Sequence, residues 1–162
     1  MSLSPLVHRW LGSLRDVVGQ FAYRTAYHAM RKFKKYLGER FFSGSVVAVL
    51  CRERVLLVQS SYRTALCLPG GRTRPGETPE QTACREIREE VGILLKSNDL
   101  VPVGNKGCIW LFEMHFDDEP SIRINNREII DAAFYPLSEL PALPIDRMVR
   151  EYLSMRCARK TV

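Results

Sequence analysis

Residues 70–93 read GGRTRPGETPEQTACREIREEVGI, and this stretch is the most informative part of the sequence. Its centre, Thr78-Pro-Glu-Gln81, carries three start signals for a helix: a threonine N-cap, a proline at the first helical position, and a glutamine that completes a capping box. Gly92 supplies the stop signal. The spacing therefore predicts a helix over residues 79–91, preceded by a loop rich in glycine and proline.

Three glutamates fall on one face of this predicted helix. Glu86, Glu89 and Glu90 are spaced i, i+3 and i+4, which places their carboxylates within about 100° of arc. Like charges at these spacings destabilise an isolated helix by about 0.2–0.5 kcal/mol per pair, so a compensating cation is expected. An all-oxygen donor set suits Mg²⁺, or Mn²⁺ as its substitute, and the natural partner of such an ion is a polyphosphate. A solvated acidic helix face is the alternative that the spacing alone leaves open.

The segments around the helix predict a mixed α/β (α+β) domain. Two short apolar runs flank a polar turn, which is typical of a hairpin or of two adjacent strands. Strands are expected over residues 45–50, 55–59, 108–116 and 132–135, a single helical turn over 137–140, and a helix over about 145–158. Residues 41–162 are therefore expected to form one domain, whose charges balance.

The first 40 residues have a different character. They hold eight Lys or Arg and two acids, so they carry the whole net charge of +6. Apolar residues recur there at three- and four-residue steps, which predicts a basic amphipathic helical arm of one or two helices with a break near residues 22–25. These residues include Trp10, Leu14, Val18 and Phe21. The first interpretation is packing on the body or on a second subunit in a homodimer. Attachment to an anionic membrane surface is the second, and nucleic-acid contact is the third.

Composition excludes several classes of protein. The chain has 162 residues, 46% of them hydrophobic, which is enough for one ordinary core. Five dispersed cysteines without a C-x-x-C pair indicate free thiols rather than a disulfide framework or a zinc site. No apolar run approaches the ~18 residues of a spanning helix. We expect a cytoplasmic protein, with peripheral membrane association or an organellar transit peptide as alternatives.

Residues 71–93 resemble the complete signature of the Nudix hydrolases, G-x5-E-x7-R-E-U-x-E-E-x-G-U. All nine specified positions match: Gly71, Glu77, Arg85, Glu86, Ile87, Glu89, Glu90, Gly92 and Ile93. The resemblance implies a Nudix fold, in which a mixed sheet is sandwiched between helices. It also implies Mg²⁺-dependent hydrolysis of the diphosphate linkage in a nucleoside diphosphate joined to another group.

The resemblance also implies roles for single residues. The metal ligands would be Glu86, Glu89, Glu90 and the backbone carbonyl of Gly70. Glu89 is the first choice for the general base and Glu86 is the second. Arg85 would orient a neighbouring carboxylate. Glu77, with Gly71 and Gly92, would be structural. An ordinary ion pair between Glu77 and Arg85 would serve the same purpose.

One acid outside the signature is a further candidate. Glu128, just before the expected strand at 132–135, resembles a late acidic ligand found in some family members. Asp131 competes with it, and a solvated loop acid is the other interpretation.

The substrate is less well specified. Arg72, Arg74 and Arg63 are candidate phosphate-binding residues, although each could equally be a solvated surface charge. The aromatic side chains that could stack on a base are Tyr62, Trp110, Phe112 and Phe134. Trp110 and Phe112 alternate along one expected strand, and such residues more often belong to the core. The first candidates for the substrate are nucleoside triphosphates and nucleotide sugars. The alternative to an enzyme is a non-catalytic nucleotide sensor.

Overall fold

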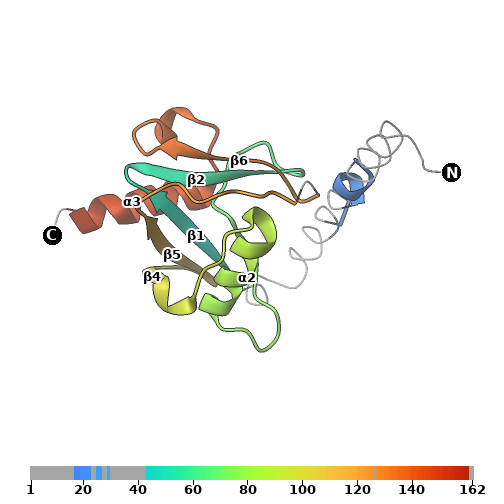
Figure 1. The fold of residues 1–162 in the computed structure, drawn as a ribbon, viewed down its shortest axis with the longest axis horizontal. Coiled ribbons are helices and arrows are strands. Elements are labelled where there is room, and N and C mark those ends of the chain that lie inside the picture. Colours follow the sequence, from blue (N-terminus) through green and yellow to red (C-terminus); the bar gives the residue numbers. More distant parts are fainter. Residues whose placement is uncertain (1–16, 23–24, 27–28, 30–42, 126, 161–162) are drawn as a thin grey trace.

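A six-stranded mixed sheet forms the centre of the computed structural model, which describes residues 17–22, 25–26, 29, 43–125 and 127–160 (Figure 1). The strands are β1 (Gly44–Cys51), β2 (Arg54–Ser60), β3 (Gly70–Arg72), β4 (Val101–Lys106), β5 (Ile109–Phe116) and β6 (Ile129–Pro136). The helices are α2 (Pro79–Val91) and α3 (Arg147–Lys160), with short 3-10 turns η2 (Ser97–Asp99) and η3 (Leu140–Ala142).

The first strand organises the sheet, whose order is β4-β5-β1-β2-β6. One edge of β1 pairs in parallel with β5, and its other edge is shared by β2 and β3, both antiparallel. β3 takes Gly44–Val46, at the opposite end of β1 from the β2 turn. The segment leading into β3 bonds to both neighbours, since Cys67 exchanges two hydrogen bonds with Val58 of β2 and the Val47 N–H donates to Pro69 O at 3.0 Å. These contacts place the loop before α2 beside the start of β1.

Helices cover both faces of the sheet. Alternate residues of β1 point to opposite sides, so Val47 and Val49 enter one apolar core while Ala48 and Leu50 enter the other. The first core receives Ala83, Ile87 and Val91 of α2, and the second receives Val149 and Tyr152 of α3. Figure 1 shows α2 and α3 on the two sides of β1. The predicted mixed sheet between helices is confirmed.

Helix α2 has the predicted bounds and the predicted caps. The Thr78 side chain accepts from Gln81 N at 3.2 Å, and Gln81 Oε1 accepts from Thr78 N at 2.9 Å. Gly92 ends the helix in the left-handed region with φ 73°, which glycine adopts without the steric cost of a Cβ. The capping residues Thr78, Gln81 and Gly92 therefore begin and end the helix where the sequence predicts.

Several other elements differ from the sequence predictions. β3 and β4 were not predicted, because β3 is Gly-Gly-Arg and β4 contains Pro102 and Gly104 at an edge of the sheet. The turn expected at 137–140 lies at Leu140–Ala142 instead, with a proline at one of its first two positions. α3 starts at Arg147, because Asp146 Oδ1 accepts from Val149 N at 3.0 Å and caps the helix there.

The described part of the basic arm is helical. Residues 17–22, 25–26 and 29 have helical backbone, and Val17, Val18 and Phe21 are exposed by 58%, 61% and 73%. The other residues of the arm, including 23–24 of its expected break, lie outside the described residues, so the arm stays a prediction. Within the described ranges, no helix is both long enough and apolar enough to cross a membrane.

Candidate active site

One ion pair locks the loop before α2 onto the helix. Arg85 Nε donates to Glu77 Oε1 at 2.6 Å and Arg85 Nη2 donates to Glu77 Oε2 at 2.8 Å, so the pair is bidentate. Arg74 N and Thr82 Oγ1 donate to the same carboxylate at 2.8 and 3.1 Å. The Arg85 hydrogen bonds, followed by the Arg74 backbone, lower the pKa of Glu77 to about 2. Glu77 is therefore fully engaged in holding the loop.

The same guanidinium reaches the acidic face of the helix. Arg85 Nη1 donates to Glu86 Oε1 at 2.6 Å and lies 3.4 Å from Glu89 Oε2, while Nη2 donates to Arg72 O at 2.9 Å. The Arg85 side chain is only 9% exposed. A single partly buried cation thus connects β3, the loop and two of the candidate carboxylates.

Close backbone approach brings β3 against the helix. A Cβ on Gly71 would lie 2.6 Å from Glu86 Cδ, so no larger residue fits there without moving that carboxylate. Beside it, the Gly70 N–H donates to Glu90 Oε2 at 2.9 Å, and Glu90 is 4% exposed. The structural role expected of Gly71 and the Gly70 carbonyl as a metal ligand both stay predictions.

The carboxylates form a cluster of like charge. Burial raises the pKa of Glu86, against the lowering effect of Arg85, and burial raises the pKa of Glu90 well above its usual range. The charge of Glu128 contributes to both increases, which places this residue in the field of the α2 acids. Asp131 is exposed on β6, opposite Gln59. Of the two acids outside the signature, Glu128 lies near the α2 acids, and its role as a metal ligand stays a prediction.

The oxygen donors of the acidic cluster have the chemistry that a hard divalent cation prefers, but their side chains do not converge on one point. Buried and half-buried carboxylates with raised pKa values are stabilised by a cation, and oxygen donors suit Mg²⁺ or Mn²⁺. Among the described residues, no three His, Cys, Asp or Glu side chains are grouped closely enough to hold a metal ion. Glu89 is instead paired with Arg74, whose Nη2 lies 3.2 and 3.1 Å from its two carboxylate oxygens. This ion pair would compete with any cation that Glu89 binds.

The three candidate phosphate-binding arginines lie in two places. Arg72 and Arg74 are exposed beside α2, on β3 and on the following loop. Arg63 follows β2, lies over the Tyr62 ring at 5.8 Å from its centroid, and pairs with Asp146 at 3.3 Å. Arg63 also contributes favourable charge to the neighbourhood of Glu90. Arg74 and Arg63 therefore both interact with acids of α2, and phosphate binding by the three arginines stays a prediction.

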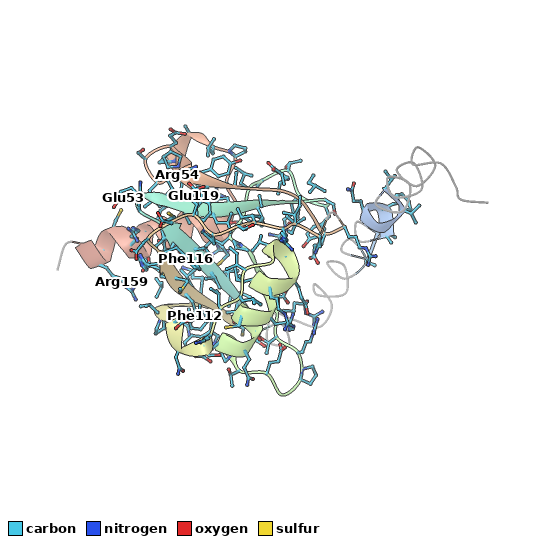
Figure 2. The ribbon with its side chains drawn as sticks, viewed as in Figure 1. Glu53, Arg54, Phe112, Phe116, Glu119 and Arg159 are labelled. Atoms are coloured by element: carbon cyan, nitrogen blue, oxygen red, sulfur yellow. The ribbon has the colours of Figure 1, made fainter. Side chains whose placement is uncertain are left out.

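Two of the aromatic candidates lie on β5. Phe112, drawn in Figure 2, is 1% exposed and belongs to the α2-side core, while Trp110 is 38% exposed and stacks on it at 6.4 Å between centroids. Phe112 is therefore unavailable to a base.

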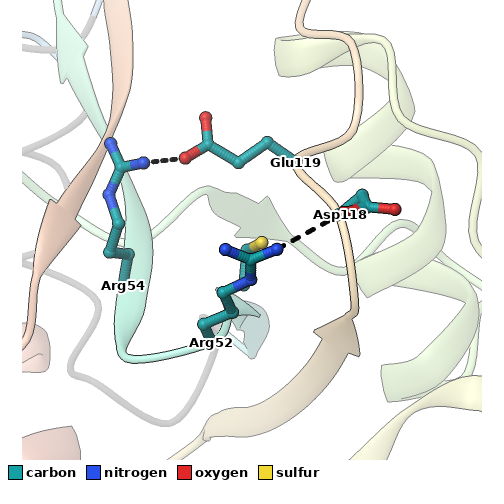
Figure 3. A pocket seen from close by; sticks show the side chains of 5 residues that line it. Arg52, Arg54, Asp118 and Glu119 are labelled. Atoms are coloured by element: carbon teal, nitrogen blue, oxygen red, sulfur yellow. Dashed lines mark hydrogen bonds and ion pairs between the residues drawn. The ribbon is translucent and has the colours of Figure 1, made fainter.

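A separate pocket opens at the β1–β2 turn, the opposite end of β1 from β3 (Figure 3). Its charges pair internally, because Arg54 binds Glu119 and Arg52 lies 3.7 Å from Asp118. The pocket is distinct from the acidic cluster.

The sequence did not predict that Asn125 and Tyr62 would lie beside Glu128. Asn125 bonds both to the turn that carries Glu128 and to α2, and the Tyr62 hydroxyl donates to Glu128 Oε1 at 2.9 Å. Tandem asparagines before Glu128 were a turn signal. Nothing in the sequence indicated that Tyr62, 66 residues away, would lie against this acid.

Comparisons with known proteins agree with this arrangement. The chain is 34% identical over 107 residues to a human 8-oxo-dGDP phosphatase, covering 59% of this chain and 33% of the relative. It is 33% identical over 127 residues to a NAD-capped RNA hydrolase of Stutzerimonas stutzeri, covering 68% of this chain and 42% of the relative. The chain thus spans less than half the length of these curated relatives.

Solved structures share the fold. A bifunctional NMN adenylyltransferase/ADP ribose pyrophosphatase from Francisella tularensis, complexed with AMP and a manganese ion, superposes with a TM-score of 0.64 at 18% identity, covering 98% of this chain and 55% of that chain. The NUDIX domain family has a model that matches residues 42–155. With the glutamate-bearing helix, its locking arginine and the mixed sheet all in place, the chain belongs to the NUDIX domain family.

Proposed function

We propose that this chain hydrolyses a diphosphate linkage in a nucleoside diphosphate joined to another group, as a divalent-cation-dependent pyrophosphohydrolase. The observation that carries the proposal is the acidic cluster of Glu86, Glu89 and Glu90, with Glu128 in its field and Arg85 locking the helix face. Binding alone would not require so many clustered like charges, and the buried ones are costly without a cation.

The chain's own residues have distinct tasks in this proposal. Glu86, Glu89, Glu90, Glu128 and the Gly70 carbonyl would hold Mg²⁺ or Mn²⁺. When bound, the cation would neutralise the pyrophosphate charge and lower the pKa of the attacking water.

A carboxylate must accept the proton of that water, and Glu89 is our first choice because it is more exposed than Glu86 or Glu90. Arg85 would orient Glu86 and Glu89. Arg74 and Arg72, with Arg63 on the border, would bind the phosphates.

The substrate class is proposed as a nucleoside triphosphate or a nucleotide sugar. Relatives and structural neighbours are described as acting on 8-oxo-dGDP, NAD-capped RNA and ADP-ribose, so the comparisons support diphosphate chemistry without selecting one substrate. The deciding experiment is a panel of these compounds, nucleoside triphosphates and nucleotide sugars with Mg²⁺ or Mn²⁺, followed by product identification. Hydrolysis that requires the cation supports the proposal. Tight nucleotide binding without turnover of any compound would instead establish a nucleotide sensor.

A second role is proposed for the N-terminal segment, attachment to an anionic membrane surface. Val17, Val18 and Phe21 are exposed on helical backbone, within a sequence region that carries the net charge of +6. The test is sedimentation with phosphatidylserine vesicles, comparing the full chain with a deletion of residues 1–40 and with Phe21→Glu. Salt-sensitive binding lost in both variants supports the role. A concentration-dependent dimer or RNA retention, lost in the same variants, would favour one of the other two interpretations.

A further inference from the structure

Asn125 joins the end of α2 to the turn that carries Glu128. The last four carbonyls of a helix lack partners within the helix and need them from elsewhere. At the end of α2, the Gly92 N–H donates to Arg88 O and the Arg123 N–H donates to Val91 O at 2.9 Å. The side chain of Asn125 supplies a third donor, because its Nδ2 donates to Glu89 O at 3.2 Å. The segment that leads to β6 is thereby fixed along the end of the helix (Figure 1).

The same side chain also shapes the turn. Asn125 Oδ1 accepts from the backbone N–H groups of Arg127, Glu128 and Ile129, at 3.1, 3.1 and 3.2 Å. These three donors identify the oxygen end of the carboxamide, so its nitrogen end is the one that faces Glu89 O. One side chain thus sets the position of Glu128 relative to the backbone of Glu89.

Glu128 is held from the opposite side by the loop that follows β2. The Tyr62 hydroxyl donates to Glu128 Oε1 at 2.9 Å, and the Ser61 N–H donates to Glu128 O at 2.8 Å. A half-buried carboxylate with its backbone and its side chain both fixed loses little conformational freedom when it binds a cation. Mutation of a residue that holds a metal ligand in this way typically lowers metal affinity by about 10- to 100-fold.

We propose that Asn125 and Tyr62 are positioning residues that hold Glu128 opposite the α2 glutamates and so complete the cation site. This inference rests on the proposed function, because it assumes that Glu128 contributes to binding of the divalent cation. Neither residue touches the substrate or the reacting atoms in this proposal. Both act only through Glu128.

The test measures Mn²⁺ binding by the full chain, from the electron paramagnetic resonance signal of free Mn²⁺, without substrate. Tyr62→Phe removes one hydroxyl and Asn125→Ala removes the carboxamide. Each is made in the wild-type and in the Glu128→Gln background. Each single variant is expected to weaken Mn²⁺ binding by about 10- to 100-fold. In the Glu128→Gln background, neither change should weaken it by more than about twofold, because interactions that act through one group are not additive.

Controls separate the possible failures. Asn105→Ala alters an exposed asparagine on β4 and should bind Mn²⁺ as wild type does. Thermal unfolding of each variant establishes that it is folded, and Tyr62→Phe remains informative if Asn125→Ala unfolds. Unchanged Mn²⁺ affinity in folded single variants would overturn the inference, as would an equal loss in the Glu128→Gln background. Failure of the proposed function is distinct, because wild type itself would then neither bind Mn²⁺ nor hydrolyse any compound of the panel.

Discussion

The contact between Gly71 and Glu86 allows a small change to test the proposed chemistry. An alanine Cβ at position 71 would lie 2.6 Å from both Cδ and Oε1 of Glu86 and 2.8 Å from its Oε2. Carbon atoms in ordinary contact lie ~3.5–4.0 Å apart, so the Glu86 carboxylate must move by about 1 Å. Gly71 does not need the left-handed region, so alanine adds no backbone strain there.

The displaced group is the far end of a side chain, which explains why the fold should tolerate the change. Moving Glu86 disturbs its 2.6 Å contact with Arg85 and its place among the candidate ligands. A misplacement of ~1 Å in a catalytic arrangement can cost about 100-fold in rate. We therefore expect Gly71→Ala to lower kcat/KM by about 10- to 100-fold and to lower the free energy of unfolding by less than about 1 kcal/mol.

The assay is steady-state hydrolysis of the best panel substrate with saturating Mg²⁺, together with urea unfolding of the same preparation. Gly107→Ala is the matched control, because its added Cβ meets open space but the backbone has φ 61°. That variant should lose about 1–2 kcal/mol of stability and keep its turnover. A wild-type kcat/KM in the Gly71→Ala variant would refute the reasoning. A lower kcat/KM that is fully explained by a smaller folded fraction of the variant would refute it too.

Three further predictions test the charges of the site and the opposite face of the sheet. Glu89→Gln should lower Mg²⁺-dependent turnover by about 100-fold or more while circular dichroism stays unchanged, and equal rates would exclude Glu89 as the base. Arg74→Ala should tighten Mn²⁺ binding up to about fivefold, because an exposed ion pair with Glu89 worth ~0.2–1 kcal/mol no longer competes, while KM rises. Glu113 is buried under α3, where burial raises its pKa but hydrogen bonds, first from Tyr152, produce a net lowering. Glu113→Gln should therefore cost about 1–3 kcal/mol at neutral pH. Because the folded-state pKa is lowered, this loss should shrink as the pH falls below the usual glutamate range, and a pH-independent loss would contradict the assignment.

Short-range signals were sufficient for the helix that carries the site. The Thr78 cap, the proline after it and Gly92 act within one or two turns of the chain, so the predicted bounds of α2 are those of the structure. The hairpin and the strand of β5 were likewise predicted, because β-branched and apolar runs identify buried strands. β3 could not be predicted in this way, since Gly70–Arg72 becomes a strand only by pairing with the start of β1.

The sequence by itself determined that Glu86, Glu89 and Glu90 share a helix face and that the chain resembles the Nudix hydrolases, because spacing along a helix is a local property. Only the tertiary structure decided that Glu128 rather than Asp131 lies in the field of these acids, and that Tyr62 and Asn125 hold it there. The contact of Tyr62 with Glu128 joins residues 66 apart, and that of Asn125 with Glu89 joins residues 36 apart. Their positions are set by the order of strands in the sheet and by the end of α2.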